Sequence, residues 1–154
     1  MATEHSTLTG SDLHEPKGTA AANADQIYIA NGSGSGAWTN GDNNIYLTLE
    51  LTDCSTASST WLPSPCTGII TKVQTILHTV ISSGNAAITV ELNGTAVTGG
   101  AITIAHSGSA VGDIDTSSPS DNRTLAVGTK VELISDGGST NAARVTAVLT
   151  ITPT

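Results

Sequence analysis

Hydrophobic and polar positions alternate with a period of two along much of the chain from residue 44 onward. The clearest example is residues 44–52, where every second side chain is a large aliphatic one: Ile45, Leu47, Leu49 and Leu51. This pattern is typical of a β-strand with one buried face. The same alternation recurs in four further segments: 88–92, 102–104, 131–133 and 145–152.

The segments between these runs are rich in Gly, Ser, Asn or Pro, as expected for loops. They comprise residues 53–65, 82–85, 93–100, 106–122 and 136–141. Asn93-Gly94 is the most specific turn signal, because both residues adopt positive φ at low cost. Residues 68–81 are apolar on both faces in places and predict a long central strand. About seven or eight strands without a helix predict an all-β, β-sandwich or jelly-roll-like domain over residues 43–154.

The first 42 residues have a different pattern and predict an extended N-terminal arm. Within residues 1–25, Leu8 and Leu13 are the only large aliphatic side chains, so this stretch cannot bury enough surface to fold alone. The apolar run 26–30 and residues 37–39 flank a Gly-Ser segment that starts with Asn-Gly. We therefore expect a short strand or hairpin near residues 26–39.

Composition narrows the classes of partner. Thirteen acidic and five basic residues give a net charge of −8, and the basic residues are scattered, which argues against nucleic acid. The sequence shows neither a secretory signal at residues 1–5 nor an apolar run long enough to cross a membrane. We expect no membrane partner, and synthesis in the cytoplasm.

The two cysteines, Cys54 and Cys66, enclose a short loop and are a candidate disulfide pair. A reducing cytoplasm would delay pairing until export or lysis, and two cysteines alone do not establish a disulfide framework. Pairing and free thiols therefore both stay open at the level of the sequence.

Candidate chemistry is sparse, and we predict no catalytic, cofactor-binding or metal-binding residues. The four histidines are far apart and lack the short spacing of zinc ligands. Asp113, Asp115 and Asp121 could gather around calcium, but a solvated acidic loop is the favoured interpretation. Glu50 and Glu91 lie in the polar phase of predicted strands, where exposed sheet residues are expected rather than a glycosidase pair. We therefore predict a non-enzymatic protein.

A resemblance to a known family adds to this interpretation. The segment from Leu8 to Gly18 has the core Leu-His-Glu-Pro-Lys-Gly at residues 13–18 and continues to Trp38. This segment resembles an arm of structural proteins in tailed bacteriophages. Residues 90–97 and 137–142 look like parts of a β-sandwich found in phage virion proteins. The resemblance implies a capsid decoration (cement) protein on the outer capsid surface of the virion, with a head- or tail-fibre module binding host surface or glycan as the alternative.

The resemblance also implies partners. Proteins of this kind bind the major capsid protein and are commonly homotrimers, so we expect self-association with a trimer favoured. The residues expected to contact the capsid or a neighbouring subunit are the apolar and turn-forming side chains of the arm. They are Leu8, Leu13, His14, Pro16, Ile27, Tyr28, Ile29 and Trp38.

Overall fold

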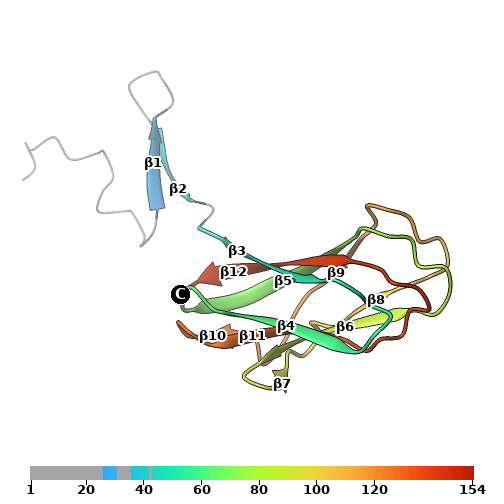
Figure 1. The fold of residues 1–154 in the computed structure, drawn as a ribbon. Coiled ribbons are helices and arrows are strands. Elements are labelled where there is room, and N and C mark those ends of the chain that lie inside the picture. The colour runs from blue at the N-terminus through green and yellow to red at the C-terminus, as the bar shows by residue number, and fades with distance from the viewer. Residues whose placement is uncertain (1–25, 31–35, 42) are drawn as a thin grey trace, which may run out of the picture. The chain divides into compact units, whose positions relative to one another are not determined.

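The computed structural model describes residues 26–30, 36–41 and 43–154, and these residues form β-strands without a helix (Figure 1). The chain divides into two units, residues 1–43 and 44–154. The prediction of an all-β fold is confirmed. No helix long and apolar enough to cross a lipid bilayer occurs among these described residues.

The described part of the first unit is an antiparallel hairpin. Strand β1 (Gln26–Ala30) pairs with β2 (Gly36–Asn40) so that Tyr28 lies opposite Trp38. A short strand or hairpin was expected near residues 26–39, and the structure has the hairpin. Its two runs of alternating side chains give it two distinct faces.

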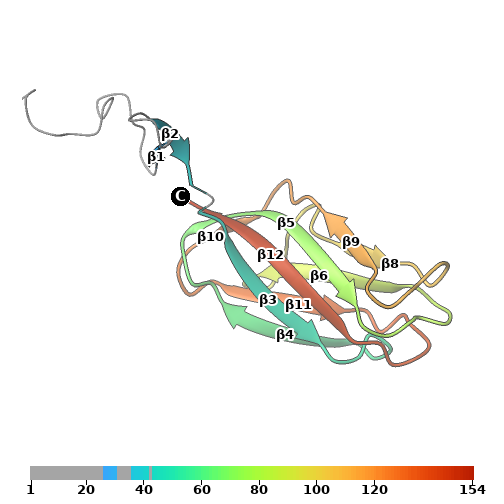
Figure 2. The same ribbon diagram turned by 90° about the horizontal axis from the view of Figure 1, so that it is seen from above.

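The second unit contains two five-stranded antiparallel sheets, seen as two layers in Figure 2. In the first sheet the order is β10-β5-β12-β3, with β9 also pairing with β5; in the second it is β4-β11-β6-β7, with β8 also pairing with β6. The strands of the first sheet are β3 (Ile45–Leu51), β5 (Gly68–Leu77), β9 (Ile114–Ser117), β10 (Thr124–Leu125) and β12 (Val145–Pro153). Those of the second sheet are β4 (Ser58–Pro63), β6 (Ala86–Leu92), β7 (Thr95–Ala96), β8 (Ile102–Ile104) and β11 (Lys130–Ser135).

Both sheets contribute to one buried hydrophobic cluster. Every second residue of β12 is fully buried from Val145 to Ile151, and β6 and β11 show the same alternation. The cluster is made of Ile, Leu, Val and Ala side chains together with Cys54, and it contains no aromatic ring. A core of branched aliphatic side chains suits strands, because these side chains pack well on a pleated surface.

Two local features differ from the sequence expectation. The long strand expected over residues 68–81 ends at Leu77, and it contains a bulge where Thr150 and Ile151 of β12 oppose Lys72 and Ile70. Strands β4, β7 and β9 lie inside segments predicted to be loops. Strand β9 is mostly polar, and β4 has Trp61, Leu62 and Pro63 in succession rather than alternating with polar residues. Their sequences therefore resemble loops although the backbone of each pairs with a neighbouring strand.

Candidate interaction surface

The N-terminal hairpin carries four of the side chains that the sequence indicated for partner binding. Tyr28 and Trp38 lie on one face and meet edge to face, with ring centroids 5.3 Å apart and ring planes at 62°. Ile27 and Ile29 lie on the opposite face, and each is 55% exposed. The other predicted contact residues, Leu8, Leu13, His14 and Pro16, lie outside the described residues.

The hairpin is therefore apolar on both faces. An isolated two-stranded hairpin is at best marginally stable in water, since it cannot bury a core of its own. The indole Nε1 of Trp38 is buried and has no hydrogen-bond acceptor among the described residues. A buried indole N–H normally finds an acceptor, so this donor is left unsatisfied within the described part of the hairpin.

A close approach inside the hairpin requires glycine at its second strand. A Cβ atom at Gly36 would overlap the Ile29 carbonyl oxygen and would lie 2.8 Å from the Tyr28 ring. Because Tyr28 lies over this position, Gly36 allows the aromatic pair to form.

The cysteines occupy opposite ends of the sheet unit, and the structure contains two free thiols. The Cys54 backbone N–H donates to Ala143 O, just before β12 begins, whereas Cys66 precedes Gly68, which pairs with Pro153 at the end of β12. The six-residue strand β4 runs between them and spans about 20 Å. A disulfide requires Cα atoms within about 7 Å, so the candidate pairing of Cys54 with Cys66 within one chain is wrong.

The acidic residues that might have formed a calcium site do not gather. Asp113 and Asp115 line a shallow hollow of about 190 Å³ with Ser107 and Ser109. Asp121 instead lies at the bridge to Thr98. Among the described residues, no group of three or more His, Cys, Asp or Glu side chains is placed to hold a metal ion.

Ionisation of Asp115 is disfavoured in this hollow. Burial raises the pKa of Asp115, and the negative charge of nearby Asp113 raises it further. The Asp113 carboxylate accepts a 2.6 Å hydrogen bond from the Ala110 backbone N–H and thereby holds the loop. This arrangement accounts for Asp113 as a turn-forming residue.

The carboxylates considered for glycoside hydrolysis lie on different sheets. Glu50 lies on the outer face of β3, 3.5 Å from Arg144, whereas Glu91 lies on the outer face of β6 in the other sheet. Two carboxylates on the outer faces of different sheets cannot flank one glycosidic bond.

Two of the histidines have polar neighbours within hydrogen-bond distance. His78 Nε2 lies 2.9 Å from Thr146 Oγ1, and His106 Nδ1 lies 2.9 Å from Asn85 Oδ1.

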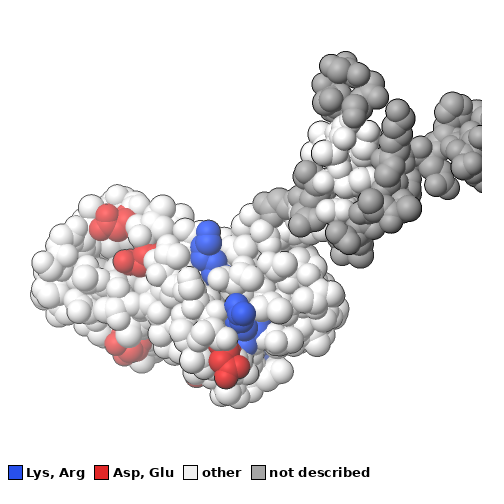
Figure 3. Space-filling view, turned by 180° about the vertical axis from the view of Figure 1, so that it is seen from behind, with Lys and Arg blue, Asp and Glu red and all other residues white. Residues whose placement is uncertain are grey.

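Charged side chains do not form a basic surface. On the face drawn in Figure 3 they are few, and the basic ones do not gather into a patch. Lys130 forms an ion pair with Glu132, which lowers the pKa of that glutamate, mainly through the hydrogen bond from the lysine. Half of the four described basic side chains are thus neutralised by an acid.

Large apolar side chains are exposed at a few places in the sheet unit. The largest is Trp61 of β4, which is 59% exposed beside the partly exposed Leu62. The sequence analysis did not place Trp61 on a strand, because the surrounding residues 58–63 lack alternation.

Comparison with known proteins gives no further identification. No protein-family model matches the chain, and no curated protein matches it.

Proposed function

We propose that the chain is a capsid decoration protein of a tailed bacteriophage, which binds the outer surface of the major capsid protein and stabilises the shell. In this proposal the second unit is a β-sandwich of jelly-roll type exposed on the virion, and the N-terminal segment is the attachment element. The chain is made in the host cytoplasm and self-associates on the capsid.

The observation that carries the proposal is the hairpin of β1 and β2. It presents Ile27 and Ile29 to solvent on one face and holds an aromatic pair on the other. Such an element gains stability when a partner covers its apolar face, since burying one large aliphatic side chain contributes roughly 1.5–3 kcal/mol. The resemblance of residues 8–38 to arms of phage structural proteins supports the capsid as that partner.

Glu50 and Glu91 lie on the outer faces of different sheets, which supports a structural role over a hydrolytic one.

A binding experiment tests the proposal. Capsids assembled without the protein are mixed with the full chain and with the double variant Ile27→Asp, Ile29→Asp, and bound protein is measured after sedimentation. The matched control carries Val111→Asp and Val127→Asp, which change two exposed apolar residues of the sheet unit. The hairpin variant should lose binding by at least about a hundredfold, since two apolar contacts are replaced by desolvated charges.

Equal binding by the wild type and the hairpin variant would contradict attachment through the hairpin. If the control rather than the hairpin variant lost binding, the sheet unit would be the attachment surface.

A fibre-type module that binds glycan is a second candidate, favoured by one observation. The exposed indole of Trp61 is the kind of flat apolar surface on which a sugar ring stacks. Binding of the full chain to host cells or purified polysaccharide, lost on Trp61→Ala, would favour this function. Retained capsid binding without any cell binding would favour decoration.

A further inference from the structure

The two sheets both end on the same side of the second unit, in strands β3 and β4 (Figures 1 and 2). Strand β4 (Ser58–Pro63) pairs only with β11, so its other edge is open among the described residues. An open edge carries a row of backbone N–H and C=O groups that can pair with another strand.

The hydrogen bonds around β11 establish which groups of β4 face this open edge. The Asn93 N–H donates to Lys130 O, so the backbone N–H and C=O of Lys130 point toward β6. Because these groups alternate in direction along a strand, those of Val131 point toward β4. The Ser64 N–H donates to Thr129 O, in the same phase. Ser58, Thr60 and Leu62 therefore bond to β11, whereas Ser59, Trp61 and Pro63 direct their backbone groups outward.

The other edge strands are protected in ways that β4 is not. Strands β7 and β10 are two residues long, β8 is three, and β9 carries the acidic Asp115. Strand β3 carries the exposed Glu50. Short length and charge are the usual means by which proteins prevent sheets from pairing at their edges. Strand β4 has six residues in a continuous register with β11 and no charged side chain, and it is blocked only at its end, where Pro63 lacks an N–H.

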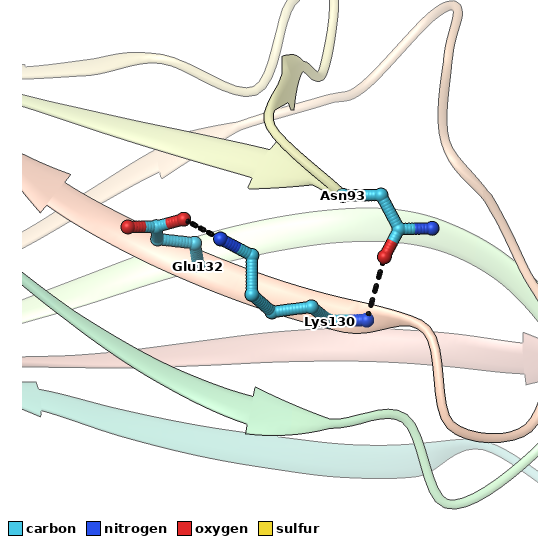
Figure 4. Close-up of polar contacts among 3 residues, drawn as sticks. All are labelled: Asn93, Lys130 and Glu132. Atoms are coloured by element: carbon cyan, nitrogen blue, oxygen red, sulfur yellow. Dashed lines mark hydrogen bonds and ion pairs between the residues drawn. The ribbon is translucent and has the colours of Figure 1, made fainter.

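Charge further favours a second copy of this chain as the occupant. With a net charge of −8, two copies repel one another over most of their surfaces. Strand β4 is uncharged, and the nearest charges on β11, Lys130 and Glu132, neutralise each other in an ion pair (Figure 4). This edge is therefore a place where two copies can approach without bringing like charges together.

We propose that β4 pairs antiparallel with β4 of a second copy, joining the two second sheets into one continuous sheet. Pro63 has no N–H and so cannot complete an outward pair of bonds. In the register that uses only residues with both an outward N–H and an outward C=O, Ser59 lies opposite Trp61 of the second copy. By symmetry, Trp61 lies opposite Ser59 of the second copy. Thr60 then faces Thr60 of the second copy across the two-fold axis, and four backbone hydrogen bonds form.

The pairing also covers apolar surface. Trp61 and Leu62 lie next to the axis, and both are exposed in the single chain. This inference specifies the form of the self-association that the proposed function includes. It rests on the proposed function only for the expectation that the chain self-associates. It differs from the trimer implied by the family resemblance, because a contact between identical edges is isologous and closes with two copies.

Sedimentation of the full chain tests the pairing. The wild type should sediment as a dimer, and Trp61→Lys and Ser59→Pro should each raise the dissociation constant by about tenfold or more. Trp61→Lys introduces a charge at the edge, and Ser59→Pro removes an outward N–H while leaving the bonds to β11 intact. Val127→Lys, an equal apolar-to-lysine change at an exposed site outside β4, is the control and should remain dimeric.

Cross-linking tests the register. In a Cys66→Ser background, Thr60→Cys should form a disulfide-linked dimer on mild oxidation, because a directly opposed pair without mutual hydrogen bonds has Cα atoms about 4.5 Å apart. Ser59→Cys in the same background should form at least tenfold less disulfide-linked dimer. In this register each Ser59 lies opposite Trp61 of the second copy, two residues along the strand from the second Ser59. Cys54 is fully buried and stays in both chains.

A monomeric wild type, a trimer unaffected by Trp61→Lys and Ser59→Pro, or equal cross-linking at positions 59 and 60 would overturn the inference. Each of these results leaves the capsid proposal intact, because that proposal is tested by substitutions at Ile27 and Ile29 of the hairpin and not by substitutions in β4. Circular dichroism of each variant checks that the sheets still form, and a variant that fails this check is replaced by Ser59→Lys.

Discussion

Asn93 and Lys130 are joined by two hydrogen bonds that connect a hairpin turn to the neighbouring strand. The Asn93 N–H donates to Lys130 O at 3.0 Å, and the Lys130 N–H donates to Asn93 Oδ1 at 3.1 Å (Figure 4 shows the second). Asn93 and Gly94 have φ of 50° and 85°, as the two-residue turn between β6 and β7 requires. The predicted Asn-Gly turn is thus confirmed, and its side chain also extends the pairing of β6 with β11.

Asn93→Ala should destabilise the sheet unit by about 1–2 kcal/mol, because alanine tolerates a left-handed backbone poorly and cannot accept the Lys130 N–H. Asn93→Asp keeps both properties and should cost less than about 0.5 kcal/mol. Urea unfolding followed by circular dichroism measures the difference. Equal free energies of unfolding for the two variants would show that neither the side-chain bond nor the positive φ contributes.

Gly36→Ala should prevent closure of the N-terminal hairpin, because the added Cβ would overlap the Ile29 carbonyl oxygen and crowd the Tyr28 ring. The near-ultraviolet circular dichroism from Tyr28 and Trp38 should be lost. Unfolding of residues 44–154 should be unchanged, since they form a separate unit. Ala37→Ser, at the exposed neighbouring position, is the control and should keep the aromatic signal. Retention of that signal in Gly36→Ala would contradict the close packing at this position.

Asp115→Asn should make the protein more stable at neutral pH. Burial, followed by the charge of Asp113, raises the pKa of Asp115 in the folded state. The favourable contribution of this group is therefore complete below its unfolded pKa of about 3.9 and is lost as the pH rises through the higher folded value. The variant should have the higher melting temperature at pH 7, and the difference should shrink toward pH 3.

A matched measurement separates the two causes. In Asp113→Asn, the pKa of Asp115 followed by nuclear magnetic resonance should fall only in part, because burial is the larger cause. A complete return to the ordinary value would assign the shift to charge instead.

Cys66 should react with iodoacetamide in the folded protein, whereas Cys54 should react only after unfolding. Cys54 is fully buried, and burial raises the pKa of its thiol, which lowers the thiolate fraction further. Mass spectrometry of alkylated peptides, with and without denaturant, measures both. Oxidation of the folded monomer should give no disulfide within the chain, and the appearance of a Cys54–Cys66 peptide would contradict the position of β4 between them.

The sequence by itself predicted the strands that line the core, the Asn93-Gly94 turn and an all-β fold. These features follow from local rules: a side chain's face alternates along a strand, and positive φ selects Asn and Gly. It also indicated Ile27, Tyr28, Ile29 and Trp38 as contact residues. Which of them share a face was decided by the register of β1 with β2.

Only the tertiary structure decided the positions of the edge strands and the cysteines. Strand β4 lacks hydrophobic alternation because one strand supports it and much of its surface faces water. Cys54 and Cys66 are twelve residues apart in a segment that resembles a loop, yet the pairing of β4 with β11 extends that segment and separates them. Strand pairing depends on contacts between residues far apart in the chain, and a sequence pattern records the burial of a strand but not the neighbour with which it pairs.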